Sequence, residues 1–301
     1  MTFTKYVAKN KWIYIFLLPG IAYFLYFHYF PMYGLHIAFK DYNVLLGFAK
    51  SPWAGLKHFR VLFKDPMFYR IFRNTMLICL YKLLVGFPFP ILISLFLNEI
   101  RLLAFKRTIQ SIIYVPHFIS WPVIGGITYA LLSPQWGAIA GIFELLHIEP
   151  VNFLTSKEHF RGILVMTSLW KTFGWNTIVY LAALTMIDPE LYEAAMIDGA
   201  GRFRRMWHVS VPGIMHVIVI LLLLRVGTIL DTGFDQVMSL ANPMVLEVAE
   251  IFDTYTYKVG ILEWRFSYTT AVGLFKSAIG LVLVVGANSI SRKVYRQGAI
   301  W

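Results

Sequence analysis

Six long apolar stretches dominate this chain, and they restrict its fold more than any other feature. They lie at about 12–31, 75–98, 112–132, 162–187, 213–231 and 269–290. Each is near the roughly 20 helical residues needed to cross a hydrocarbon core of about 30 Å, where every backbone polar group must be bonded internally. With 58% hydrophobic and 14% charged residues and a mean hydropathy of +0.64, the sequence predicts an all-α integral membrane protein. We expect six transmembrane helices in a single domain, 1–301.

The first stretch follows a lysine-rich start, as a secretory signal would. Its apolar run is longer than that of a signal peptide and no Ala-x-Ala cleavage site follows, so we expect a retained helix. The single cysteine, Cys79, excludes an internal disulfide and a site of several thiolates. No metal site is predicted, because the eight histidines show no His-Glu-x2-His or similarly tight spacing.

Lysines and arginines indicate that both termini are cytoplasmic, because short cytoplasmic loops accumulate these residues. Three cations occur in each of four short segments: Lys5, Lys9 and Lys11; Arg101, Lys106 and Arg107; Arg202, Arg204 and Arg205; Arg292, Lys293 and Arg296. The outer segments after the third and fifth stretches carry only two each: Lys157 and Arg161; Lys258 and Arg265. We therefore predict a multi-pass protein of the cell membrane.

The segment 39–73 opposes this rule, since it carries seven cations on the predicted outer side. Between 56 and 67, apolar residues recur at helical spacing around Lys57, Arg60 and Lys64, which favours an amphipathic helix lying on the membrane surface. Its cations would contact lipid headgroups. An outer vestibule that attracts an acidic solute is the alternative interpretation.

Four cations fall inside the predicted helices, where each costs at least about 2.5 to 3.5 kcal/mol. Lys82, Arg225 and Lys276 lie roughly 10 Å from the outer helix ends, at about 1.5 Å per residue, so we expect them to snorkel outward. Lys171 lies near mid-membrane and should face protein or water. Prolines also interrupt the second and third stretches and favour a pathway over a plain anchor. These are Pro88, Pro90, Pro116 and Pro122.

The fourth stretch combines aromatic and hydrogen-bonding side chains on neighbouring faces. Trp175 lies on the same helical face as Lys171, and Thr172, Asn176 and Tyr180 form an adjacent polar stripe. Aromatic faces stack on sugar rings and polar groups bond their hydroxyls, so the stripe suits a sugar passage. Hydrogen bonding between helices that only stabilises the bundle is an equally good interpretation of any one of these residues.

A weaker stripe on the fifth stretch suggests a second wall of the passage. It consists of Arg225, Thr228 and Thr232, with Asp231 beside it. Arg225 and Asp231 could equally form a structural ion pair.

Other functional classes are poorly supported. The chain lacks the Gly-x4-Gly-Lys-Ser/Thr phosphate loop, so no ATP hydrolysis is expected within it. The net charge of +11 is explained mostly by membrane topology, and no basic segment is joined to a soluble nucleic-acid-binding fold. A membrane enzyme or scaffold is the poorer hypothesis, and no catalytic residues are predicted.

A polar island at 188–212 separates the fourth and fifth stretches. Asp188 is a good N-cap, Pro189 suits a first helical position and Glu190 adds charge in the first turn, so a short helix is predicted over 189–198. Gly199 should end it, and a second short basic helix over 202–210 should lead to Pro212, which opens the fifth transmembrane helix. Small and charged residues at fixed spacing predict a docking element at the cytoplasmic surface.

The island matches the Glu-Ala-Ala-x3-Gly-x9-Ile-x-Leu-Pro motif in Glu193-Ala194-Ala195, Gly199 and Val209-Ser210-Val211-Pro212. On this motif the chain resembles the permease subunits of binding-protein-dependent ABC importers. Nearly the whole chain resembles the LplB-type polysaccharide and oligosaccharide permeases of the sugar branch. The supporting segments are 110–121, 233–236, 253–260, 270–275 and 288–293.

The resemblance implies a type I importer with a MetI-like permease bundle. This chain would pair with a second, homologous permease subunit on two ATPase subunits, which bind ATP and Mg²⁺, while an extracellular binding protein delivers an oligosaccharide. The coupling residues implied are Glu193, Ala194, Ala195, Asp198, Gly199 and Pro212. The chain itself needs no cofactor. The alternative within transporters is a type I permease for a peptide or an anion.

Overall fold

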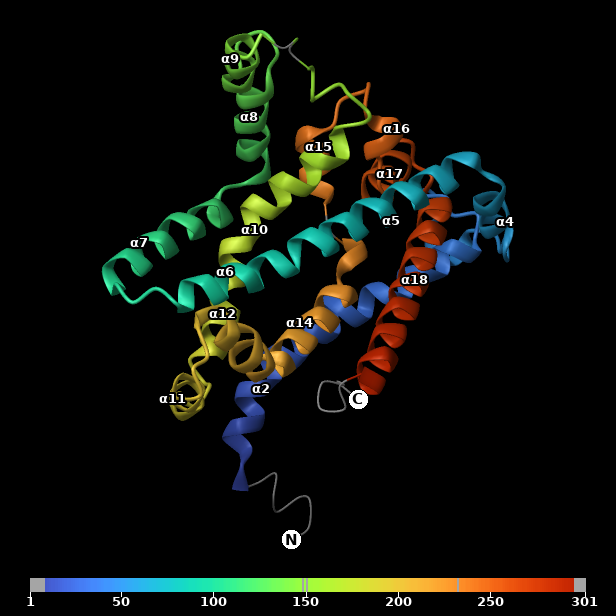
Figure 1. Ribbon diagram of the computed structural model, residues 1–301. Coiled ribbons are helices and arrows are strands. Elements are labelled where there is room, and N and C mark those ends of the chain that lie inside the picture. The colour runs from blue at the N-terminus through green and yellow to red at the C-terminus, as the bar shows by residue number, and fades with distance from the viewer. Residues whose placement is uncertain (1–8, 148, 150, 232, 295–301) are drawn as a thin grey trace. The chain divides into compact units, whose positions relative to one another are not determined.

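The computed structural model describes residues 9–147, 149, 151–231 and 233–294 (Figure 1). Thr232 of the predicted second wall and the terminal cations Lys5 and Arg296 therefore lie outside the described residues. Secondary structure in the described ranges is helical, apart from one isolated bridge between Lys40 and Trp53. The chain divides into two compact units, residues 1–65 with 256–275 and residues 66–255 with 276–301.

The first unit begins with a long apolar helix. It runs as α2 (Lys11–Phe24) and continues without interruption through the π-helical turn η1 (Leu25–Tyr29) and the 3-10 helix η2 (Phe30–Phe39). The predicted stretch at 12–31 thus forms, but the helix continues beyond it to Phe39. The remaining elements of the unit are α3 (Gly47–Lys50), α4 (Lys57–Lys64), η6 (Tyr257–Leu262) and the first part of α18 (Phe266–Val294).

The helix α4 is amphipathic, as its spacing predicts. Leu62 is fully buried and the Phe59 ring packs on Phe39 with ring centroids 5.5 Å apart, while Arg60 is exposed. The C-terminal part of the unit is tied to its N-terminal part by two hydrogen bonds. Ser267 Oγ accepts from the backbone N–H of Tyr42 at 2.9 Å, and the Tyr268 hydroxyl donates to Asp65 Oδ2 at 3.1 Å.

The second unit contains most of the helices. Its first half comprises α5 (Pro66–Gly86), α6 (Pro88–Asn98), α7 (Leu103–Tyr114), η3 (Val115–Phe118), α8 (Trp121–Leu132), α9 (Ala138–Leu145) and α10 (Phe160–Leu184). Its second half comprises α11 (Pro189–Ile197), α12 (Arg202–Arg205), η4 (Met206–Ser210), α13 (Val211–Gly213), α14 (Met215–Gly227), η5 (Ile229–Asp231), α15 (Phe234–Leu240), α16 (Leu246–Ala249), most of α17 (Phe252–Thr256) and the rest of α18.

Proline residues explain where several of these helices begin. Pro66, Pro88 and Pro122 lie in the first turns of α5, α6 and α8. A backbone N–H there has no partner within the helix, so proline loses no hydrogen bond. The predicted second stretch therefore starts earlier, at Pro66, and has a break at Phe87. The predicted stretch at 112–132 is interrupted, as its prolines predict, but the size of the bend was not predicted: the segments Leu103–Phe118 and Trp121–Leu132 meet at an angle of 106°.

Three helical segments of the described chain are long and apolar enough to cross a membrane. They are Lys11–Phe39, Pro66–Asn98 and Phe266–Lys293. Two bent pairs bring the number to five if each counts as one span: the pair just described, and Arg202–Gly213 with Met215–Gly227, which meet at 62°. The remaining predicted span, at 162–187, forms the helix α10 but is not among them.

α10 is the central helix of the second unit and packs against α5, α6 and α7 (Figure 1). Twelve of its residues are buried. Its first half joins an apolar cluster with α5, α15 and α16, and its second half joins another with α6 and the segment 206–214. The helix therefore connects both ends of the unit, and its neighbours set the environment of each polar residue on it.

Candidate functional site

The polar island folds as two short helices, as the sequence predicts. The N-terminus of α11 is capped by Asp188, whose Oδ1 accepts a hydrogen bond from the backbone N–H of Glu190 at 3.0 Å. Pro189 occupies the first helical position, where proline is favoured. The start of this helix is thus fixed by residues within the island itself.

Gly199 ends α11 by adopting a left-handed backbone conformation, with φ of +74°. Its N–H donates to Met196 O at 3.0 Å and the N–H of Ala200 donates to Ala195 O at 2.9 Å. This pair of bonds is a Schellman motif, which favours glycine because a side chain strains the left-handed conformation. A Cβ at Gly199 would meet no atom within 4 Å, so the constraint is one of backbone conformation rather than space.

The island exposes apolar side chains on both of its helices. Ile197 is 87% exposed, and Leu191, Met196, Phe203 and Trp207 are also exposed. Of the motif residues, Glu193, Ala194 and Asp198 are exposed and Ala195 is half-buried. Exposed apolar side chains gathered in one segment and edged by charges mark an interaction surface.

One contact joins the two helices of the island, and another ties the island to the rest of the second unit. The Tyr192 hydroxyl and Ser210 Oγ, 2.9 Å apart, link the first helix to the second. Arg205 forms an ion pair with Glu99, outside the island, at 3.9 Å. The prediction for Pro212 needs correction. It lies in α13, which continues from the second island helix, and the chain bends after it so that the fifth long helix α14 begins at Met215.

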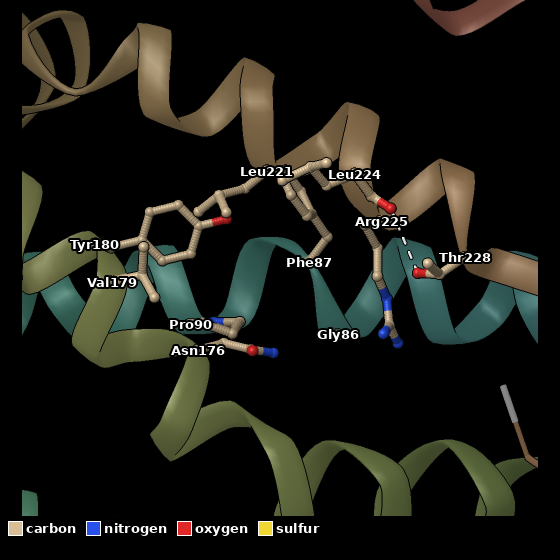
Figure 2. A pocket seen from close by; sticks show the side chains of 10 residues that line it. All are labelled: Gly86, Phe87, Pro90, Asn176, Val179, Tyr180, Leu221, Leu224, Arg225 and Thr228. Carbon is tan, nitrogen blue, oxygen red and sulfur yellow. Dashed lines mark hydrogen bonds between the residues drawn. The ribbon is translucent and has the colours of Figure 1, made fainter. Parts of the chain in front are cut away.

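A cleft of about 310 Å³ opens between α10, α14 and the junction of α5 with α6 at Phe87 (Figure 2). Its lining residues are Gly86, Phe87, Pro90, Asn176, Val179, Tyr180, Leu221, Leu224, Arg225 and Thr228. Four predicted pathway residues, from two different helical segments, meet here. These are Asn176, Tyr180, Arg225 and Thr228.

The cleft combines aromatic surface, polar groups and one cation. The Phe87 and Tyr180 rings pack edge to face with centroids 6.5 Å apart. Arg225 extends from α14 toward the α5–α6 segment (Figure 2). Among the described residues its guanidinium has no hydrogen-bond or ion-pair partner, and none of those that line the cleft is Asp or Glu.

The other three predicted pathway residues do not line this cleft. Lys171 Nζ donates to the backbone carbonyls of His117, at 2.9 Å, and Ile119. These carbonyls lie at the bend between η3 and α8, so Lys171 satisfies polar groups that the bend leaves without helical partners. Trp175 stacks on the His117 ring at 4.6 Å, and Thr172 Oγ1 donates to Ser168 O within its own helix.

Two of the cations expected to snorkel outward instead have partners inside the second unit. Lys82 is 5% exposed and donates to Gln236 Oε1 at 2.5 Å. Gln236, itself fully buried, donates from Nε2 to Leu164 O and Thr167 Oγ1, both at 2.7 Å. Lys82 is therefore held by a hydrogen-bond network anchored on α10.

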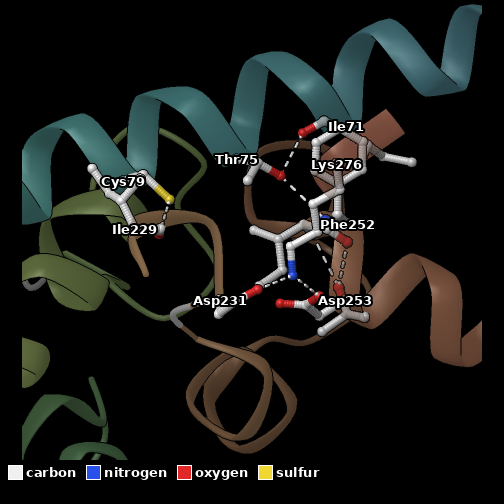
Figure 3. A network of polar contacts seen from close by, with 10 residues as sticks. Ile71, Thr75, Cys79, Ile229, Asp231, Phe252, Asp253 and Lys276 are labelled. Atoms are coloured by element: carbon white, nitrogen blue, oxygen red, sulfur yellow. Dashed lines mark hydrogen bonds and ion pairs between the residues drawn. The ribbon is translucent and has the colours of Figure 1, made fainter. Parts of the chain in front are cut away.

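Lys276 forms ion pairs with Asp231 Oδ1 at 2.7 Å and with Asp253 Oδ1 at 2.6 Å (Figure 3). The suggested pair of Arg225 with Asp231 is thus wrong, because Asp231 contacts Lys276. Beside this cluster, Thr75 Oγ1 accepts from the backbone N–H of Phe252 at 3.1 Å (Figure 3). The segment after α14 is consequently fixed to both α5 and α18.

Sequence reasoning assigned no role to Gln236 and Asp253, although both lie in segments that supported the family resemblance. Gln236 is a single buried amide that bonds residues of two other helices, and such a residue produces no periodic pattern in the sequence. The acidic partners of Lys276 were likewise undetermined, because residues so far apart along the chain can pair only through the tertiary fold.

Comparison with known proteins agrees with the resemblance noted from the sequence. The family model described as the binding-protein-dependent transport system inner membrane component matches residues 86–296. Protein LplB of Bacillus subtilis (strain 168) is 48% identical over 97% of this chain and 92% of its own length. The polygalacturonan/rhamnogalacturonan transport system permease protein YteP of the same organism is 47% identical over 97% of this chain and 91% of its own length.

A solved structure has the same fold. It is a chain of a bacterial alginate ABC transporter, crystallised in complex with a periplasmic protein that holds an alginate pentasaccharide. The match has a TM-score of 0.90 and 37% sequence identity, and covers 98% of each chain.

Proposed function

This chain belongs to the family of inner membrane components of binding-protein-dependent transport systems, and on that premise we propose that it forms half of a pathway that imports oligosaccharides or polysaccharide fragments. YteP is named for polygalacturonan and rhamnogalacturonan transport, and the matching solved structure belongs to an alginate transporter. The chain is a transport component and not itself an enzyme. The observation that carries the substrate class is the cleft in which aromatic and hydrogen-bonding side chains meet.

The proposed architecture is a single permease domain of six spans with both termini in the cytoplasm. Both bent pairs count as spans in this proposal, and α10 is the sixth. At about 1.5 Å per residue this helix extends roughly 38 Å, enough to cross a membrane. Its polar groups do not forbid this, since protein neighbours bury or bond most of them.

We further propose that α11 docks in a groove of a partner ATPase subunit. Support comes from its exposed apolar side chains and its small residues Ala194 and Ala195. Tyr192 also links it to the second island helix, which an ion pair of Arg205 ties to Glu99. Closure of the ATPases would then displace a helix that is tied to the transmembrane bundle. The proposed coupling residues are Glu193, Ala194, Ala195, Asp198, Gly199 and Pro212.

The remaining partners follow from the same proposal. A second, homologous permease subunit completes the pathway, two ATPase subunits bind ATP and Mg²⁺, and an extracellular binding protein delivers the glycan. Within this chain the substrate would contact the cleft residues Asn176, Tyr180, Arg225 and Thr228. Outside the cleft, Lys171 and Trp175 would maintain the bend after η3 through their contacts with His117, while Thr172 bonds within its own helix.

A permease for an anion is the second candidate, favoured by one observation. Arg225 lines the cleft without a partner among the described residues, and any anion of suitable size would satisfy it. A peptide is recognised by the same chemistry through its carboxylate terminus. Stimulation of the ATPases by each class of solute distinguishes these from a glycan.

The assembled transporter, reconstituted in nanodiscs with its binding protein, tests the function. A panel of neutral oligosaccharides, acidic oligosaccharides, short peptides and inorganic anions would be added separately, and ATP hydrolysis measured. We expect stimulation by oligosaccharides only. Stimulation by peptides or inorganic anions, with none by any oligosaccharide, would contradict the proposed substrate class.

The coupling role is tested by Gly199→Asp. A non-glycine residue in the left-handed conformation costs up to roughly 1 to 2 kcal/mol, less for Asp than for most residues. The new carboxylate also lies beside the like charge of Asp198. We expect about a tenfold or greater loss of binding-protein-stimulated ATP hydrolysis and of uptake, with normal membrane insertion. The matched control is Gly201→Asp, in the same loop but at a helix N-cap with ordinary negative φ, where Asp is favoured. Wild-type uptake and stimulation in Gly199→Asp would refute the coupling assignment.

A further inference from the structure

The four intramembrane cations of this chain are not equivalent in the folded protein. Lys276 is neutralised by two carboxylates, Lys171 is bonded to two backbone carbonyls, and Lys82 is bonded to Gln236. Arg225 differs, because its guanidinium lines a cleft and has no partner among the described residues. We propose that Arg225 binds a carboxylate of the transported glycan, so that the cleft selects acidic, uronate-containing oligosaccharides. This inference rests on the proposed function.

A cation left without a partner inside a membrane protein is costly, and such residues usually pair with an opposite charge or serve a pathway. Asp231 is the carboxylate closest to Arg225 along the chain, but in the folded protein it forms an ion pair with Lys276. In the part of the chain that the structure describes, no acidic residue lines the cleft. The chain thus provides the cation but not the anion, and a bound substrate can supply it.

The electrostatic surroundings strengthen this preference. Lys82 lies close enough to Arg225 for the two charges to repel each other, and its partner Gln236 carries no charge. Arg225 lines the cleft, Lys82 adds a second positive charge near Arg225, and none of the described lining residues is negative, so the cleft favours an anionic ligand over a neutral or cationic one. Lys82 is buried and Arg225 half-buried, so salt screens them less than it would at the surface.

The chemistry of the side chains matches a carboxylate on a sugar. The planar guanidinium of Arg225 can donate two parallel hydrogen bonds to one carboxylate, a geometry that lysine does not offer. Asn176 supplies an amide donor and acceptor for hydroxyl groups, and Phe87 and Tyr180 supply aromatic surface. At about 310 Å³ the cleft is at the small end of ligand sites, which suits one sugar ring of a longer chain at a time.

A matched pair of probes tests the proposal without depending on the binding protein. Trigalacturonate and its fully methyl-esterified form have the same sugar backbone, but only the first carries carboxylates. Binding of each to the purified complete transporter would be measured by titration calorimetry, in wild type, Arg225→Gln and Arg225→Lys. Uptake into proteoliposomes with the binding protein gives a second readout.

We expect wild type to bind trigalacturonate at least about tenfold more tightly than its ester, as loss of a charge-assisted hydrogen bond implies. Arg225→Gln should abolish that difference by weakening trigalacturonate binding, and Arg225→Lys should restore part of it. Arg107→Gln is the matched control, because Arg107 is an exposed arginine of the same unit that does not line the cleft. It should keep the wild-type difference.

Two further outcomes separate this proposal from the function on which it rests. If wild type binds neutral oligosaccharides and does not prefer trigalacturonate to its ester, the carboxylate site is wrong while the glycan permease stands. An undiminished preference in Arg225→Gln that still assembles with its partners also overturns the role of Arg225. If wild type binds no oligosaccharide of either kind, the proposed function itself fails.

Discussion

The N-terminal helix Lys11–Phe39 is highly apolar but poorly buried within the protein, whereas the central helix α10 is less apolar but well buried. Lys11–Phe39 is apolar enough to count as a span, yet α2 and η1 bury no side chain. α10 fails the same criterion, yet twelve of its 25 residues are buried. Hydropathy therefore does not identify the helix on which the fold of the second unit depends.

The difference has a physical cause. A helix face without protein neighbours in a membrane must be apolar, because lipid offers no hydrogen bonds. α10 is surrounded by other helices, which supply partners for its polar groups, as the carbonyls of His117 and Ile119 do for Lys171. Polar side chains tolerated for this reason are available for function. A long, buried helix that is not apolar enough to count as a span is therefore a good place to look for a pathway.

The largest expected effect that tests this comparison comes from two glycines. A Cβ on Gly174 in α10 would lie 1.9 Å from Ile113 O, a backbone atom of α7, so the two helices would have to separate. We expect Gly174→Ala to destabilise the protein by roughly 3 kcal/mol or more, as overpacking at a backbone contact implies, and to lower its melting temperature in nanodiscs.

Gly20→Ala in α2 is the matched variant, because a Cβ there meets nothing within 4 Å. It should leave the melting temperature unchanged or slightly raised, since alanine is the better helix former. Equal destabilisation by Gly20→Ala and Gly174→Ala would show that α2 is as closely packed as α10, and would break the comparison.

A smaller effect is expected from replacing a lysine in each helix. Lys171→Met leaves the carbonyls of His117 and Ile119 without their donor. An unsatisfied buried acceptor costs about 1 to 3 kcal/mol. Water in a neighbouring pocket can bond the freed carbonyls and offset part of this cost. We therefore expect a destabilisation of about 2 kcal/mol in thermal unfolding, the middle of that range.

Lys11→Met at the start of α2 is the comparison. Among the contacts described for Lys11, its ammonium lies only over the face of the Trp12 ring, 5.5 Å from the ring centroid. The change should therefore stay within about 0.5 kcal/mol, as is usual for surface substitutions. Stability of Lys171→Met equal to that of wild type would mean that the bend after η3 does not need Lys171.

The smallest effect concerns the loop that follows η2. The hydrogen bond from Lys57 lowers the pKa of Asp41 below its usual value. This pair therefore stabilises the protein above that value and ceases to do so as the pH falls through the lowered pKa. Because both side chains are largely exposed, Asp41→Asn should cost less than about 1 kcal/mol at neutral pH. The difference from wild type in melting temperature should shrink as the solution is acidified below the usual pKa; a constant difference would point to a cause other than the ion pair.

Much of the local structure was predictable because its causes are local. Asp188, Pro189 and Gly199 set the start and end of α11 through bonds to residues a few positions away, and the structure has both. The existence of the helices at 12–31, 75–98, 162–187 and 269–290 followed from length and apolar composition alone. Their bounds did not, since Pro66 extends one and η2 extends another.

The candidate site was only half predictable. Asn176 and Tyr180 share a helical face by sequence spacing, and Arg225 and Thr228 share another, but no periodic pattern shows that the two faces meet. The prolines predicted an interruption of the third stretch, but not the bend of 106° between Leu103–Phe118 and Trp121–Leu132. Proline marks where a helix can break and not how far it turns. Lys171 is bonded at that bend, so its environment could not be read from its own helix.

The sequence by itself determined that the chain is a helical membrane protein, that a capped, glycine-terminated short helix follows Asp188, and which family the chain resembles. Hydropathy, capping and motif spacing act over short distances along the chain. The tertiary structure alone decided which charges are satisfied. Lys276 forms an ion pair with Asp231, Lys82 donates a hydrogen bond to Gln236, and Arg225 lines the cleft without a partner in the described chain. Ion pairs depend on contacts between residues far apart in sequence, and those contacts exist only after the helices have packed.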